Sequence, residues 1–90
     1  MNKEYLSLDD IKVGDKVDIG KISRIYNTYI LLSNTYIDNE TSFTNGIIEY
    51  IGEKNQDMLD IYNNCMKKYG RRPMIIYNEY IGGIKSWDHF

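Results

Sequence analysis

The sequence predicts a small α+β domain in which a curled antiparallel sheet of five to six strands is packed by one α-helix near residues 55–69. Apolar side chains in that segment recur three and four residues apart, which is typical of a helix with one buried face. The segments on either side are short apolar runs divided by Gly and Asn, which is typical of strands and turns. A length of 90 residues corresponds to a single domain spanning residues 1–90.

The first third of the chain is expected to contain a short helical turn and a bent strand. Ser7 and Asp10 have the spacing of a loose capping box, so a turn is expected near residues 7–11. A strand is expected from Lys16 to Tyr26. Its apolar alternation changes phase near Gly20, which indicates a bulge or a sharp bend.

The middle of the chain is expected to form a series of short antiparallel strands. Asn27-Thr28 and Ser33-Asn34 are expected to be turns. The expected strands and the loop between the last two follow in this order: strand 29–32, strand 35–38, loop 39–45 and strand 46–51.

The helix has recognisable start and stop signals. Asn55 is a good N-cap, and Gly70 supplies a left-handed C-terminal stop. Pro73 prevents the helix from resuming. A strand is expected over residues 74–81, and Gly82-Gly83 predicts a hairpin turn from which residues 84–87 pair back.

The segment LDDIKVGDKVDIGKI, residues 8–22, resembles the entry strand of SH3-like small barrels. It has an apolar-Asp lead-in followed by Val-Gly-Asp-x-Val. The resemblance covers about fifteen residues. It implies a small barrel and carries over no functional residue.

Charge and composition limit the function classes. The net charge is −2, but residues 1–60 hold six Lys or Arg against eleven Asp or Glu, giving −5, whereas residues 61–90 hold five against two, giving +3. The sequence has no apolar run long enough to cross a bilayer and no apolar core of a signal peptide, so a cytoplasmic location without membrane attachment is expected. Ile, Asn, Tyr and Lys are heavily used and Ala is absent, which indicates AT-rich coding, as in low-GC bacteria and their phages.

No catalytic, metal or cofactor motif is present in the sequence. The only cysteine, Cys65, lies on the predicted apolar helix face, where a small core residue is expected rather than a nucleophile. The only histidine, His89, is next to last. We therefore expect no enzymatic activity, no catalytic residue, no bound metal and no cofactor.

The strongest candidate binding site is a basic cluster at the end of the predicted helix. Its cations are Lys67, Lys68, Arg71 and Arg72. Arginines can hold phosphate or carboxylate in bidentate fashion. Tyr69 and Tyr77 are close in sequence and could stack on a base. The alternative is that the cations only complement the helix dipole and add solubility.

These observations favour a small non-enzymatic binding protein. The AT-rich coding, the small size and the nine tyrosines suggest a phage or mobile-element protein that binds and inhibits a host protein with an acidic surface, for example a defence nuclease, in the manner of anti-CRISPR proteins. One alternative is a small barrel that binds nucleic acid or a nucleotide through the Lys67–Arg72 cluster. Another is a homo-oligomer that sequesters a ligand.

Overall fold

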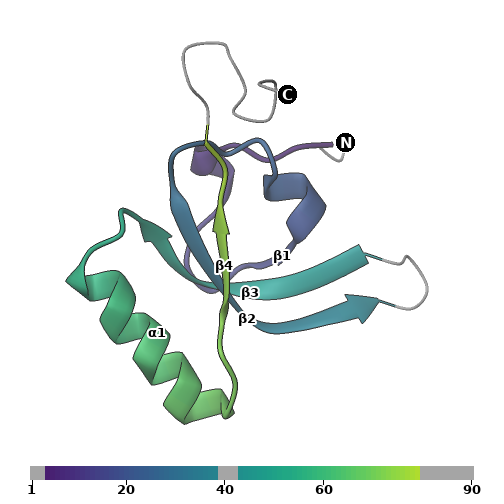
Figure 1. Ribbon diagram of the computed structural model, residues 1–90. Coiled ribbons are helices and arrows are strands. Elements are labelled where there is room, and N and C mark those ends of the chain that lie inside the picture. The colour runs from purple at the N-terminus through teal and green to yellow at the C-terminus, as the bar shows by residue number, and fades with distance from the viewer. Residues whose placement is uncertain (1–3, 39–42, 80–90) are drawn as a thin grey trace, which may run out of the picture.

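A computed structural model describes residues 4–38 and 43–79, which form one antiparallel sheet and one α-helix (Figure 1). The strand order is β1-β3-β2-β4, and every neighbouring pair is antiparallel. The elements are two short 3-10 helices, η1 and η2, four strands and α1: η1 Leu8–Asp10, β1 Lys16–Asp18, η2 Ile19–Ile22, β2 Tyr29–Asp38, β3 Phe43–Gly52, α1 Gln56–Tyr69 and β4 Met74–Tyr77. The predicted α+β class with antiparallel pairing is confirmed.

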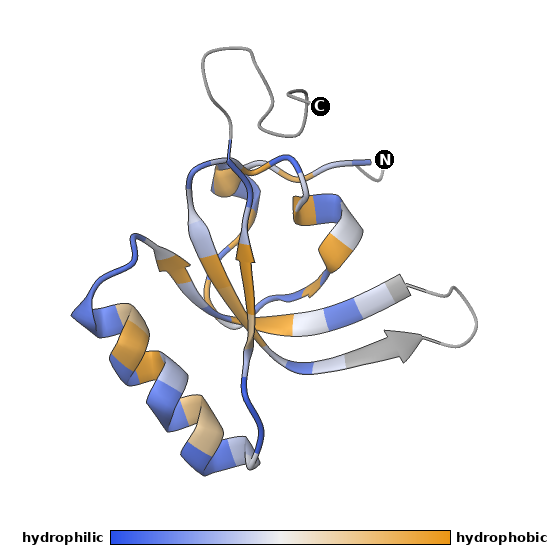
Figure 2. Ribbon diagram, in the orientation of Figure 1, coloured by the Kyte–Doolittle hydropathy of each residue, from blue (hydrophilic) through white to orange (hydrophobic). Residues whose placement is uncertain are grey.

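The two faces of the sheet have different covers. The N-terminal segment with η1 and η2 lies on one side, and α1 lies on the other (Figure 1). Apolar residues are concentrated where the strands cross behind β4 (Figure 2). The core beneath the N-terminal segment consists of Ile11, Val17, Ile22, Ile25, Ile30, Leu32 and Ile48.

Residues that alternate with this core face the helix. Leu31 lies between Ile30 and Leu32 in β2, so its side chain points to the opposite face. It is fully buried, and on α1 Met58 and Cys65 are buried as well. The helix therefore covers a second, smaller apolar layer.

α1 begins and ends where its cap residues predict. The Asn55 side chain accepts a hydrogen bond from the Met58 N–H at 3.1 Å. Gly70 is left-handed, with φ of 71°, and its N–H donates to the Met66 carbonyl at 3.0 Å. The helix predicted over residues 55–69 is confirmed. The turn expected near residues 7–11 is confirmed too, as η1, and there Asp10 accepts hydrogen bonds from the Ser7 N–H and hydroxyl.

The predicted turn at Ser33-Asn34 is wrong, because β2 continues through it. Asn34 is left-handed, with φ of 51°, and the register shifts between Ser33 and Tyr36 against β3. Asn tolerates this conformation better than most residues. One extra residue is therefore accommodated as a β-bulge inside a long strand and does not reverse the chain.

The strand predicted from Lys16 to Tyr26 is also wrong beyond Asp18. The Asp18 carboxylate accepts a hydrogen bond from the Gly20 N–H at 2.8 Å, which starts η2 and ends the strand. A short Asp side chain that bonds the backbone two residues ahead competes with strand pairing. The bend expected near Gly20 is confirmed, but it is a 3-10 helix.

Neither five to six strands nor an SH3-like barrel is confirmed. The described residues contain four strands, and the short β1 and β4 lie at opposite edges of their sheet. Part of the predicted strand 74–81 is confirmed as β4. The predicted Gly82-Gly83 hairpin and the strand over residues 84–87 lie outside the described residues. Nowhere in residues 4–38 and 43–79 is there a helix with the length and apolarity needed to cross a membrane.

Candidate functional site

The predicted basic cluster lies at the C-terminal end of α1. Lys67 and Lys68 occupy the last turn of the helix, and Arg71 and Arg72 follow its left-handed cap. All four residues are exposed, whereas Pro73, immediately after them, is buried. The cap and the buried proline thus hold four cations close together on the surface.

No described carboxylate forms an ion pair with this cluster. The one contact found for its cations places the Lys68 ammonium 5.2 Å from the centre of the Tyr69 ring. The cluster also lies at the negative end of the helix dipole, which favours positive charge. This interaction is worth about 0.3–1 kcal/mol at an exposed helix end and does not neutralise the cations, which remain available to an anionic partner.

The two predicted aromatic residues are not both next to the cluster. Tyr69 is half-buried, and its hydroxyl donates to Glu49 at 3.3 Å, so its ring is held beneath the helix. Tyr77 lies five residues beyond Arg72 along an extended segment, a distance of about 17 Å. One face of its ring stacks on Tyr29, with the ring centres 4.3 Å apart.

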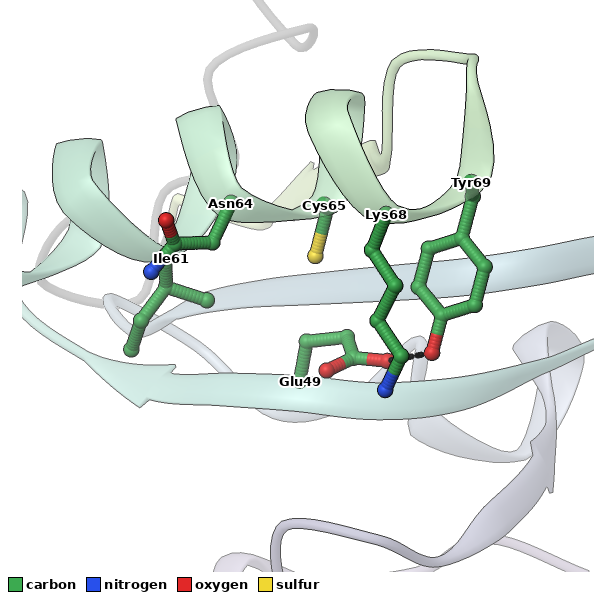
Figure 3. A pocket seen from close by; sticks show the side chains of 6 residues that line it. All are labelled: Glu49, Ile61, Asn64, Cys65, Lys68 and Tyr69. Carbon is green, nitrogen blue, oxygen red and sulfur yellow. Dashed lines mark hydrogen bonds between the residues drawn. The ribbon is translucent and has the colours of Figure 1, made fainter.

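Beside the cluster, α1 and β3 enclose a pocket that the sequence did not indicate. Its volume is about 240 Å³. Glu49 contributes from β3, and the remaining lining residues come from α1: Ile61, Asn64, Cys65, Lys68 and Tyr69. Figure 3 shows Glu49 pointing from the strand towards the helix, with Lys68 extending down beside the Tyr69 hydroxyl.

Glu49 lies at a β-bulge on the helix side of β3. Leu31 pairs with Tyr50 and Leu32 pairs with Ile48, so Glu49 is left without an opposite residue. The extra residue changes the alternation of side chains along β3. Glu49 directly follows Ile48, whose side chain lies in the core on the opposite face, so the Glu49 carboxylate points under the helix.

Two hydroxyl groups hold the carboxylate in position. Ser33, which is 3% exposed, donates from Oγ to Glu49 Oε2. Tyr69 donates to the same oxygen. Because Oε2 accepts both bonds, the second carboxylate oxygen accepts no hydrogen bond from a described residue. The pocket therefore presents an anionic acceptor that a ligand can reach.

Cys65 lies in the wall of the pocket but lacks the environment of a reactive thiol. Burial, together with the nearby Glu49 charge, raises the pKa of the Cys65 thiol, and Lys68 opposes that shift. A thiol with a raised pKa forms little thiolate at neutral pH and is a weak nucleophile. His89, the only histidine in the sequence, lies outside the described residues. The described residues also contain no group of three or more His, Cys, Asp or Glu that could hold a metal ion.

Sequence reasoning missed Ser33 and Glu49. Ser33 falls in the predicted turn at Ser33-Asn34, and Glu49 falls in the predicted strand 46–51. The available signal was a single carboxylate inside the apolar run Ile47–Ile51. Such a residue must face solvent or find hydrogen-bond partners.

Comparison with known proteins adds no relative: no family model, curated protein sequence or solved structure matches this chain significantly. Its function must therefore be argued from its own residues.

Proposed function

We propose that this chain is a non-enzymatic binding protein that engages the acidic surface of a protein partner through its basic cluster, Lys67, Lys68, Arg71 and Arg72. The observation that carries the proposal is the exposure of all four cations without an ion pair to any described residue. Cations that are already paired must break those pairs before they bind a partner. Unpaired cations on a capped helix end avoid that cost and keep a defined geometry.

The two arginines supply most of the expected specificity. A guanidinium group presents a planar fork of donors that matches a carboxylate, whereas a lysine ammonium acts as a point charge. Arg71 and Arg72 follow the rigid cap at Gly70 and precede the buried Pro73. Their backbone is therefore constrained at both ends.

A protein partner is favoured over nucleic acid for two reasons. Residues 1–60 carry a net charge of −5, which repels an extended polyanion lying along the domain. The two predicted stacking residues do not form one platform beside the cations, because the half-buried Tyr69 is bonded to Glu49 beneath α1 and Tyr77 lies at the far end of β4. A compact acidic patch requires only the helix end.

The proposal includes a biological role. An AT-rich coding sequence and a small domain fit a phage or mobile-element protein that inhibits a host factor, such as a defence nuclease, from within the cytoplasm. The partner would be inhibited if its acidic patch were the carboxylate cluster of its active site. The four cations of this chain would then cover those carboxylates and exclude the metal ions that the partner needs there. This role depends on the cluster being a binding surface.

The test is affinity capture from a nuclease-treated lysate of a low-GC bacterium. The bait is the tagged chain, an Arg71→Ala/Arg72→Ala variant, or a control variant carrying Lys12→Ala and Lys54→Ala. Both control lysines are exposed and lie away from the C-terminal end of α1. Each double variant loses two positive charges, so the two variants have the same net charge. The expected result is one acidic protein that the chain and the control retain and the arginine variant loses.

Two results would overturn the proposal. Equal retention by all three baits would show that the cluster takes no part in binding. Binding of the purified chain to duplex DNA or to RNA at physiological salt, with a steep loss of affinity as salt increases, would establish the nucleic-acid alternative. If a protein is captured, its enzymatic activity with and without the chain then tests inhibition.

A further inference from the structure

The pocket between α1 and β3 combines an anion, a cation and an apolar wall in a small volume. Glu49 lies at its base, Lys68 and the Asn64 amide lie on its helix side, and Ile61 and Cys65 provide apolar surface (Figure 3). The volume of about 240 Å³ lies below the usual range for drug-sized ligands. It suits a compact metabolite.

The Glu49 carboxylate is held in place and has one oxygen available for a cationic group. Its Oε2 is held by Ser33 and Tyr69, and its other oxygen accepts nothing from a described residue. No described Lys or Arg forms an ion pair with it. An ionised carboxylate that is partly withdrawn from water gains most from a ligand that brings both positive charge and hydrogen-bond donors. A primary ammonium group brings both.

The second charged group of the pocket has the opposite sign. Lys68 extends from α1 along the Tyr69 ring, with its ammonium 5.2 Å from the ring centre (Figure 3). A purely cationic ligand would be repelled by Lys68, and a purely anionic ligand would be repelled by Glu49. A ligand that carries both charges close together satisfies both side chains.

We propose that this pocket binds a small zwitterion of the amino-acid class, with its ammonium group on Glu49 and its carboxylate on Lys68. Its side chain then lies against Ile61 and Cys65, which favours an aliphatic amino acid. Lys68 belongs to both the pocket and the basic cluster, but the capture experiment alters only Arg71 and Arg72, which do not line the pocket, so the two proposals are tested separately.

The test uses leucine and two derivatives that each lack one charge, added at millimolar concentrations to the ¹⁵N-labelled chain. Leucinamide keeps the ammonium group and lacks the carboxylate, whereas N-acetylleucine keeps the carboxylate and lacks the ammonium group. Leucine is expected to give saturable NMR shifts at the amides of Asn64, Cys65 and Lys68. Leucinamide is expected to bind more weakly than leucine. N-acetylleucine is expected to bind more weakly than leucine by about tenfold or more, because it cannot form the charge-assisted hydrogen bond to Glu49.

Matched variants separate the two charges. Glu49→Gln is expected to weaken both leucine and leucinamide by about tenfold, because the neutral amide cannot pair with an ammonium group. Lys68→Met is expected to weaken the binding of leucine, because the leucine carboxylate loses its partner, and to strengthen the binding of leucinamide, because the repulsion between two cations is removed. Lys67→Met is the control, since Lys67 is a neighbouring exposed lysine that does not line the pocket.

The proposal is overturned if leucine causes no saturable shift, or if N-acetylleucine binds as tightly as leucine. The second comparison uses the unaltered chain and so holds even if Glu49→Gln fails to fold. A failure here leaves the capture experiment on Arg71 and Arg72 unaffected.

Discussion

Replacing Ser33 by alanine tests whether two hydroxyl groups hold a charged side chain under α1. Ser33 is 3% exposed, and its hydroxyl donates to Glu49. A hydrogen bond to a charged group contributes about 1.5–3 kcal/mol to stability. Because Glu49 is only half-buried and keeps its bond from Tyr69, we expect a loss of about 2 kcal/mol.

This loss is large for a domain of 90 residues. Domains of this kind unfold with about 5–15 kcal/mol in total. Each kcal/mol shifts the midpoint of thermal unfolding by about 4–8 °C for 60–100 residues, so Ser33→Ala is expected to lower Tm by roughly 8–16 °C. The assay is urea denaturation at neutral pH, followed by the helix signal of α1, with thermal melts alongside.

Two comparisons identify the cause of the loss. Ser23→Ala is the control, because Ser23 is exposed and donates to the neutral Gly20 carbonyl at 2.9 Å. Its expected cost is below about 1 kcal/mol. In a Glu49→Gln background, Ser33→Ala should cost less than in the native background, because the acceptor is neutral there. Equal effects of Ser33→Ala and Ser23→Ala would refute the reasoning about the half-buried carboxylate.

Further predictions concern two residues of α1 and its C-cap. Gly70→Ala should destabilise the chain by about 1–2 kcal/mol in urea denaturation. Gly70 is left-handed, and no atom lies within 4 Å of the position that a Cβ would occupy, so backbone strain alone accounts for the expected loss of stability. An unchanged urea midpoint would contradict the left-handed cap. Met58→Ala should cost about 2–5 kcal/mol, because Met58 is 2% exposed beneath the helix; a cost near zero would contradict the packing of α1 on the sheet. Cys65 should react slowly with iodoacetamide in the native chain and much faster in urea, and fast native labelling would restore the nucleophile hypothesis. The pKa of the Cys65 thiol is raised in the folded chain, so the unfolded chain loses this proton first as pH increases. The contribution of the thiol to the free energy of unfolding is therefore present below the ordinary thiol pKa of 9.0 and declines above it. Cys65→Ala should remove that part of the alkaline decline.

The helix could be predicted from the sequence because its signals are local. The apolar spacing from Met58 to Tyr69, the Asn55 N-cap and the Gly70 C-cap all act within a few residues of the backbone they control. The placement of the basic cluster followed from the same local signals, since four cations at the end of an amphipathic helix are exposed.

The sheet was less predictable because its register depends on residues far apart in sequence. Asn is a residue type that is common in turns. Pairing between β2 and β3 nevertheless keeps Asn34 inside a long strand as part of a bulge. Glu49 lies at the second bulge, and no local pattern distinguishes a glutamate covered by a helix from a solvent-facing one. The pocket could therefore be found only after strands β2 and β3 had been paired.

The central claim is that the basic cluster contacts a protein, and site-specific photo-crosslinking tests it most directly. A benzophenone amino acid is placed at Lys67, within the cluster, or at Lys12, an exposed lysine away from it. Each chain is irradiated in the lysate, and the adducts are analysed by mass spectrometry. We predict a discrete protein adduct from position 67, reduced by added salt because the contact is electrostatic, and no such adduct from position 12. Nucleic-acid adducts at position 67, or the same adducts from both positions, would contradict the claim.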